Sequence, residues 1–289
     1  MIRQIANHIA KVRIFKLSEE YLTEYPQLAI FSYDNISNYI QLRGRYENDE
    51  LTYLENHIFP RLKPGICLDI GANIGNHSVA FAPFFQKVIA FEPNPRTFML
   101  LAINADLYEN IEPLNLGASS TSAIVEAKQS LQNIGATSVK YTKERKGSVV
   151  EFKLVPIDDV KVVQASEPIT FIKLDVEGHE LQALKGAEKT IRKYRPIIAM
   201  EVLPLEIQEG ITKELRFLSD LGYNNFYEFR EAGWLGKTPR KVKAIIRTLT
   251  TLVTGKRPSK AGALVPLKFL EKRSYAMVLC SFENLGTES

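Results

Sequence analysis

The chain has 289 residues, of which 45% are hydrophobic and 24% are charged, and its formal net charge at pH 7 is +4. Such a composition is typical of a soluble protein with one large α/β domain and additions, and the net charge is too small to indicate a nucleic-acid-binding protein. No apolar run approaches the roughly 18 to 20 residues of a membrane span, and Arg3, Lys11, Arg13 and Lys16 interrupt the apolar start, so we expect a cytoplasmic protein without a signal peptide.

Residues 1–60 are expected to form an N-terminal cover, and residues 61–289 the main domain. Within the cover, Asn48 followed by Asp49 and Glu50 predicts the start of a helix. An asparagine side chain caps free N–H groups, and acidic residues in the first turn interact favourably with the helix dipole.

From Gly65 onward, apolar runs alternate with turns and helical patterns, which predicts a mostly parallel, doubly wound sheet. The predicted parallel strands are residues 66–70, 88–91, 111–116, 169–174 and 196–202, and the predicted helices include residues 95–107 and 180–194. In this strand order the first and fourth runs are neighbours. Two later runs, residues 225–229 and 275–282, are expected to pair antiparallel at the end of the sheet.

The segment 68–78, with the sequence LDIGANIGNHS, joins the first predicted strand to a helix that is expected to start near Asn76. Gly71 is expected to turn the backbone and let it approach a ligand, and Gly75 to let the helix pack closely on the strand. Free N–H groups at the helix start suit a carboxylate or another anion. Glu92 ends the next strand, where it would accept hydrogen bonds from ribose hydroxyls. Together these features predict a nucleoside-bearing cofactor, and the alternative is a strand-to-helix turn without a ligand.

Asn73 distinguishes two cofactors. The nicotinamide fingerprint G-x-G-x-x-G needs a middle glycine where the backbone contacts a pyrophosphate, and Asn73 occupies that position. The spacing D-x-G-x-x-x-G better suits S-adenosylmethionine, which has a carboxylate, an ammonium, a sulfonium and one ribose but no phosphate. The alternatives are a nicotinamide-dependent oxidoreductase and a non-catalytic protein that binds a nucleoside or a glycan.

A dense polar cluster follows the fourth predicted strand, where Asp175 begins the sequence DVEGHE. Ligands of doubly wound sheets bind beyond the carboxyl ends of the strands, so this cluster is the predicted reaction centre. For Glu177 and Glu180 the alternative is structural, since acidic residues favour a helix start. The candidate bases for a hydroxyl proton are Asp175 first, then His179 and His77. No metal is predicted, because the carboxylates lack a firm ligand spacing.

Residues 46–202 resemble the FkbM family of S-adenosylmethionine-dependent methyltransferases. The resemblance rests on the order and spacing of residues 68–78, FEPNP at 91–95, GATS at 135–138, residues 172–187, and the stretch from Arg195 to Glu201. It implies the Rossmann-like class I methyltransferase fold, with a seven-stranded, mostly parallel sheet and an antiparallel last strand. Family members mostly methylate hydroxyl groups of sugars, glycans and natural products.

The resemblance also implies roles for single residues. The methionine part of the cofactor would be held by Asp69, Gly71, Ala72, Asn73 and Gly75, and its ribose by Glu92. Its adenine edge would lie against Gly117, Ala118 and Ser119. The reaction centre would be lined by residues 175–179, which include Asp175, Glu177 and His179. Asp175 would also belong to the cofactor site.

The expected acceptor is a glycan, a sugar nucleotide or a lipid-linked sugar. Methyltransferases that act on nucleobase amines usually have N/D-P-P-Y after the fourth strand, where this chain has Asp175-Val176-Glu177-Gly178. No nucleic-acid partner is expected, because the basic residues are not interleaved with aromatic ones.

Two segments are predicted as additions to the sheet: a flap at residues 123–163 and a basic helical insertion at about 232–272. Residues 232–270 contain no acidic residue, and a helix predicted at 239–254 carries one apolar stripe. The stripe could pack on the protein's own core, contact a membrane surface, or form one wall of a cleft for a phosphate-bearing glycan. The second alternative would make the protein peripheral at the inner membrane.

Overall fold

The structure is a computed structural model that describes residues 2–130, 147–166, 168–231, 242, 246 and 262–286. The chain divides into two compact units: Met1–Asn48 with Leu62–Ile198, and Asp49–Arg61 with Ala199–Ser289. Each unit is described by itself. The predicted domain boundary between residues 60 and 61 stays a prediction.

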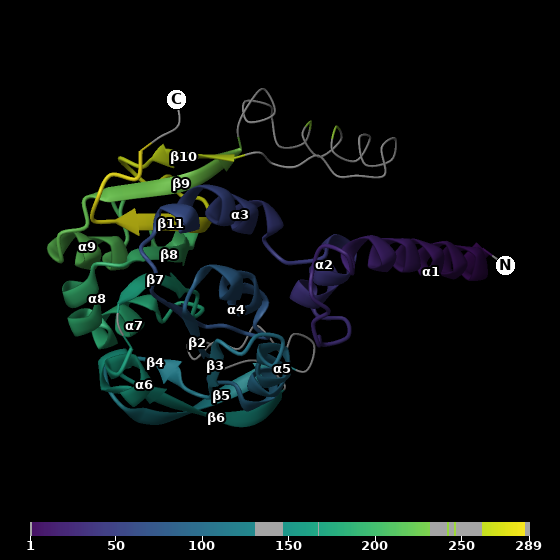
Figure 1. Cartoon of the computed structure of the whole chain (residues 1–289), viewed down its shortest axis with the longest axis horizontal. Coiled ribbons are helices and arrows are strands. Elements are labelled where there is room, and N and C mark those ends of the chain that lie inside the picture. The colour runs from purple at the N-terminus through teal and green to yellow at the C-terminus, as the bar shows by residue number, and fades with distance from the viewer. Residues whose placement is uncertain are drawn as a thin grey trace. The chain divides into compact units, whose positions relative to one another are not determined.

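The first unit is built on a parallel sheet with the strand order β7-β1-β2-β3. Figure 1 labels three of these strands, β7, β2 and β3. These strands are β1 (Ile66–Ile70), β2 (Lys87–Phe91), β3 (Ile111–Leu114) and β7 (Ile169–Leu174). The strands predicted at 66–70, 88–91 and 169–174 are confirmed here, as is the pairing of the first run with the fourth. Every residue of β1 is buried, as expected for a central parallel strand. Ile70 pairs with both Phe91 and Leu174, so three strands end side by side.

The crossover helices of this sheet follow the predicted pattern as far as α5. Helix α4 (Asn76–Phe81) packs on β1 and β2, and α5 (Pro95–Ala105) packs on β3. Asn94 caps α5 by accepting a hydrogen bond from the Arg96 N–H.

The prediction of one helix over residues 180–194 is wrong. The segment forms α7 (Glu180–Gly186) and α8 (Glu188–Tyr194), separated at Ala187. The backbone carbonyl of Ser119 packs against the end of α7, so closely that a Cβ at Gly186 would lie 2.0 Å from its oxygen. The apolar period of the sequence continues through residues 180–194, but the helix breaks where the Ser119 backbone packs against it.

A second sheet in the first unit has the strand order β4-β6-β5. Its strands are β4 (Gly117–Ala118), β5 (Ala123–Ser130) and β6 (Gly147–Val155), followed by the short helices η4 (Ile157–Asp159) and α6 (Lys161–Gln164). The strand predicted at 111–116 ends at Leu114 instead, and Gly117 pairs with β6. Residues 131–146, which include the GATS motif, lie outside the described residues.

The N-terminal part of the first unit contains α1 (Ile2–Tyr21) and α2 (Asn35–Arg43). Asp34 caps α2 by accepting a hydrogen bond from the Ser37 N–H. Helix α3 (Asn48–Tyr53) includes Asn48, the residue predicted to cap it, as its first residue, and leads into η1 (Leu54–Ile58) and η2 (Phe59–Arg61) of the second unit.

The second unit contains the antiparallel strands β9 (Asn225–Glu231), β10 (Gly262–Pro266) and β11 (Tyr275–Ser281), in the order β10-β9-β11. The predicted antiparallel pair is confirmed, and β10 is an additional strand in the basic segment. With β8 (Ile197–Val202), which begins in the first unit and ends in the second, the described strands of the main sheet number eight, where seven were expected. Between β8 and β9 lie η5 (Pro204–Glu206) and α9 (Lys213–Asp220).

Of the helix predicted at 239–254, only Val242 and Ile246 fall within the described residues. Over the described parts of the chain, no helix is long and apolar enough to cross a membrane. Cys67 and Cys280 are free and buried.

Candidate active site

Gly71 follows β1 and lies against the backbone of Asp175, which follows β7. Its φ is +83°, and a Cβ at this position would lie 1.8 Å from the carbonyl oxygen of Asp175. The Asp175 N–H also donates to the carbonyl of Ile70, over 3.0 Å. Gly71 therefore lets the backbone pass close to the residue that follows the neighbouring strand, and its approach to a ligand stays a prediction. A side chain at Gly71 would push apart the two strand ends that carry the polar residues.

Glu92 holds the loop that follows β1. Its Oε2 accepts from the Asn73 N–H at 3.1 Å, and its Oε1 accepts from the Asn94 N–H at 2.8 Å. Asn73 has a φ of +54°, which asparagine tolerates better than most residues, and its Oδ1 accepts from the Ile74 N–H. Where a nicotinamide fingerprint would present a backbone N–H to a pyrophosphate, this N–H is bonded to the protein's own carboxylate.

Two other predicted loop residues are buried at this turn. The N–H of Ala72 donates to the Phe91 carbonyl, which ties the loop to the end of β2. Gly75 has a φ of +90°, and a Cβ there would lie 2.9 Å from the side chain of Leu101 in α5. The predicted close packing at Gly75 is thus against α5 and not against the strand it follows.

Burial controls the protonation of Glu92. It raises the pKa of this carboxyl to about 7, although the N–H groups of Asn94 and Asn73 oppose the rise by stabilising the carboxylate. Near neutral pH both protonation states are therefore populated. The ionised state is the better acceptor for hydroxyl donors.

We expect Glu92 to make the cofactor-free protein less stable as pH rises through its folded-state pKa. Because the pKa is raised from 4.5 to about 7, the folded state binds the proton more tightly, and stability present below pH 4.5 is lost by pH 7. The contribution is about 3 kcal/mol. Urea unfolding at about pH 5 and about pH 8 should show a flatter pH dependence for Glu92→Gln, and equal pH dependences would contradict the assignment.

Lys173 connects the ends of β1 and β7 electrostatically. Its buried Nζ lies 3.4 Å from Asp175 Oδ2, 3.8 Å from Asp69 Oδ1 and 3.3 Å from the Gly71 carbonyl oxygen. Burial alone would lower the pKa of Lys173, but the carboxylates of Asp175, Asp69 and Glu47 outweigh it and raise the pKa above its usual value. Lys173 therefore stays charged. Lys173 is not among the site residues predicted from the sequence. A signal was present, because a lysine inside an apolar strand is buried and a buried lysine needs an anionic partner.

Asp69 is completely buried at the centre of this cluster. Its Oδ2 accepts a hydrogen bond of 2.6 Å from the Ser78 hydroxyl. Among the described residues, its Oδ1 has no hydrogen-bond partner. A buried carboxylate oxygen without a donor is costly, so it marks a place where a donor from a ligand would be favourable.

The acidic residues of the sequence that begins at Asp175 differ in burial. Glu180 is buried, and its Oε1 accepts from the Gly178 N–H at 2.8 Å, so this carboxylate supports the loop, as the structural alternative predicts. Glu177 is exposed and has a φ of +53°. The side chain of Asp175 is 38% exposed.

His179 reaches the second sheet of the first unit. Its Nε2 lies 3.0 Å from the Ser119 hydroxyl, next to the buried residues Gly117 and Ala118 of β4. A Cβ at Gly117 would meet the side chain of Leu154 at 2.5 Å. The structure thus brings the predicted adenine-edge segment next to the predicted reaction centre.

His77 pairs with a residue that the sequence did not indicate. Its Nε2 lies 3.0 Å from Oε2 of Glu47, and the two side chains are 6% and 20% exposed. Glu47 precedes His77 by 30 residues, and no local pattern links the two positions.

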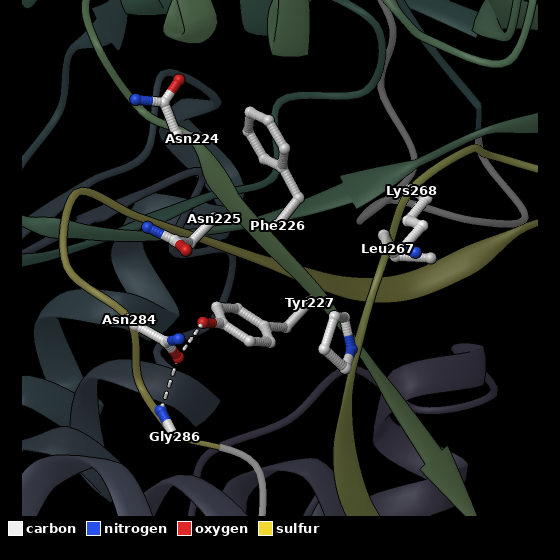
Figure 2. Close-up of a pocket in the computed structure, with 9 residues that line it drawn as sticks. Asn224, Asn225, Phe226, Tyr227, Leu267, Lys268, Asn284 and Gly286 are labelled. Atoms are coloured by element: carbon white, nitrogen blue, oxygen red, sulfur yellow. Dashed lines mark hydrogen bonds between the residues drawn. The ribbon is translucent and has the colours of Figure 1, made fainter.

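The described parts of the chain contain no group of three or more His, Cys, Asp or Glu side chains that could hold a metal ion. A pocket of about 290 Å³ lies in the second unit, lined by residues 224–227, 266–268, Asn284 and Gly286. Figure 2 shows Tyr227 and Asn284 facing each other there, joined by a hydrogen bond of 2.9 Å. None of the lining residues is an aspartate, glutamate or histidine, so none of the predicted bases lies in this pocket.

The family model for the FkbM methyltransferase domain matches residues 69–224, which is more than half of the chain. The chain belongs to the FkbM methyltransferase family. Hexuronic acid methyltransferase AglP of Haloferax volcanii is 33% identical over 145 residues, which make up 50% of this chain and 56% of that protein. The chain therefore spans only about half the length of this curated relative.

Two solved methyltransferase structures are similar at lower identity. Methyltransferase FkbM from Methylobacillus flagellatus KT is 18% identical with a TM-score of 0.42, and the match covers 95% of this chain and 60% of that one. A putative methyltransferase from Streptococcus mutans in complex with S-adenosylhomocysteine is 13% identical with a TM-score of 0.38, covering 80% and 96%.

S-adenosylmethionine is the cofactor of the FkbM family, and the chemistry of this site fits it. Each carboxylate oxygen of Glu92 accepts one backbone N–H, which leaves lone pairs for hydroxyl donors such as those of a ribose. Oδ1 of Asp69, which accepts no hydrogen bond from the described residues, is an acceptor of the kind an ammonium group requires.

Proposed function

We propose that this chain transfers a methyl group from S-adenosylmethionine to a hydroxyl group of a sugar in a glycan or glycolipid. The observation that carries the acceptor class is the 33% identity to a hexuronic acid methyltransferase. Sugar nucleotides and lipid-linked sugars are included in the proposed acceptors. The site supports a methyl donor over a nicotinamide cofactor, because the Asn73 N–H is bonded to Glu92.

In this proposal Glu92 binds the ribose, and the turn from Gly71 to Gly75, together with Asp69, holds the methionine part. Gly117, Ala118 and Ser119 lie along the adenine edge. When bound, the cofactor supplies an electrophilic methyl group on a sulfonium. The protein aligns the acceptor oxygen with this methyl group and removes the hydroxyl proton.

The proposed reaction centre contains Asp175, Glu177, His179 and His77. The Asp175 carboxylate faces the Lys173 ammonium at 3.4 Å, and its partial exposure leaves it accessible to an acceptor. Neutralising this carboxylate is therefore expected to disturb the alignment of the acceptor more than the binding of the cofactor.

For Asp175→Asn we expect an affinity for S-adenosylhomocysteine within about threefold of the unmodified chain and a methyl-transfer rate lower by about 100-fold. Calorimetry measures the first, and transfer of a labelled methyl group to glucuronate-terminated oligosaccharides measures the second. Asp159→Asn, which changes a carboxylate in η4 outside the site, is the matched control. Unchanged transfer by Asp175→Asn would remove this residue from the reaction centre.

A further inference from the structure

The backbone just before α3 is fixed to the start of α4. The Tyr46 N–H donates to Asn76 Oδ1 at 3.0 Å, and Asn76 Nδ2 donates to the Tyr46 carbonyl at 3.1 Å. Asn76 follows Gly75 directly and is 5% exposed. These two reciprocal bonds hold the N-terminal segment beside the cofactor loop, and they use only the backbone of Tyr46.

The next residue, Glu47, adopts a backbone conformation that glutamate rarely takes. Its φ is +53°, in the left-handed region that costs most non-glycine residues free energy. This turn places the Glu47 carboxylate 3.0 Å from Nε2 of His77. A glycine would relieve the strain but would lose the carboxylate.

The contact with Glu47 selects the tautomer of the neutral His77 ring. A carboxylate is an acceptor only, so neutral His77 donates its proton from Nε2, and Nδ1 keeps its lone pair. Within the described residues, no hydrogen bond reaches Nδ1. Glu47 also acts on the charge of Lys173, which places this pair in the electrostatic surroundings of Asp69 and Asp175.

We propose that His77 is the catalytic residue that takes the proton from the acceptor hydroxyl, and that Glu47 is the positioning residue that holds the neutral His77 ring in the tautomer with its proton on Nε2. This inference rests on the proposed function. The transfer forms the bond between the acceptor oxygen and the methyl carbon and breaks the carbon–sulfur bond, whose electron pair goes to sulfur. The hydroxyl proton goes to Nδ1 of His77. Asp175, already paired with Lys173, keeps the role of aligning the acceptor.

The test compares Glu47→Ala, Glu47→Gln, His77→Asn and the double variant Glu47→Ala/His77→Asn with the unmodified chain. Glu24→Gln, an exposed carboxylate of the same N-terminal part, is the control. We expect Glu47→Ala to lower kcat at least about tenfold, with the KM and the affinity for S-adenosylhomocysteine within about threefold. Glu47→Gln should recover part of the loss, because its amide oxygen still accepts from Nε2. The double variant should be no slower than His77→Asn, because Glu47 acts through His77.

Nitrogen-15 NMR of the histidine rings gives a readout that needs no acceptor. The His77 signals, assigned by their loss in His77→Asn, should show a protonated Nε2 and an unprotonated Nδ1, and Glu47→Ala should mix the two tautomers. An unchanged kcat in Glu47→Ala, additive losses in the double variant, or a protonated Nδ1 in the unmodified chain would overturn this assignment alone. No methyl transfer by the unmodified chain to any glycan, glycolipid, sugar nucleotide or lipid-linked sugar would overturn the proposed function, and this assignment with it.

Discussion

Replacing Glu92 by alanine is expected to weaken the binding of S-adenosylhomocysteine by at least about 100-fold, because two hydrogen bonds to a charged acceptor are each worth about 1.5 to 3 kcal/mol. Glu92 is buried at the end of β2 and accepts from the N–H groups of Asn73 and Asn94. Alanine would therefore remove both the proposed ribose acceptor and the support of the loop. Calorimetric titration with S-adenosylhomocysteine measures the loss.

Glu112→Ala is the matched control for this experiment. Glu112 lies on the neighbouring strand β3, where its partly exposed carboxylate pairs with Lys87. Surface ion pairs contribute about 1 kcal/mol or less, so this variant should bind the ligand like the unmodified chain. Glu92→Gln keeps one acceptor oxygen and should lie between the two. Binding by Glu92→Ala within about threefold of the unmodified chain would contradict the assignment of Glu92 to the ribose.

Lys173→Met is expected to lower the free energy of unfolding by about 3 to 5 kcal/mol, because it leaves a buried carboxylate without its cation. Asp69 is completely buried, and Lys173 is the cation beside it. Methionine fills a similar volume, so the loss reports the charge more than the packing. Urea unfolding near neutral pH measures it.

Two further variants test the cause of that loss. Lys185→Met changes an exposed lysine of α7 and should alter stability by no more than about 0.5 kcal/mol. Adding Asp69→Asn to Lys173→Met should recover part of the stability, because the unpaired charge is then removed. A double variant no more stable than Lys173→Met would show that the pair with Asp69 is not the cause.

The central strands and the cofactor loop could be predicted from the sequence because their signals are local. A parallel strand buried on both faces is an apolar run, so β1 and β7 begin and end at the predicted residues. Parallel neighbours end at the same edge of the sheet, so the loop after β1 and Asp175 after β7 are expected to lie side by side. The position of Glu92, directly after β2, was predictable for the same reason.

Contacts between distant segments could not be predicted in this way. Glu47 meets His77 across 30 residues, and Ser119 meets His179 across 60, and neither pair leaves a pattern in a short window. The break between α7 and α8 is of the same kind, since the Ser119 carbonyl packs at Gly186. Lys173 had a local signal, because it is a lysine in an apolar strand. Its partners Asp69 and Asp175 depend on how the strands pair in the sheet, which a short window of sequence does not show.

In the proposed assignment, the loop from Asp69 to Gly75, with Glu92, binds the methyl donor and not a dinucleotide. Parallel calorimetric titrations of the unmodified chain with S-adenosylhomocysteine and with NAD test it most directly. We predict micromolar, one-to-one binding of S-adenosylhomocysteine and no binding of NAD at the same concentrations. Binding of NAD without binding of S-adenosylhomocysteine would contradict the account.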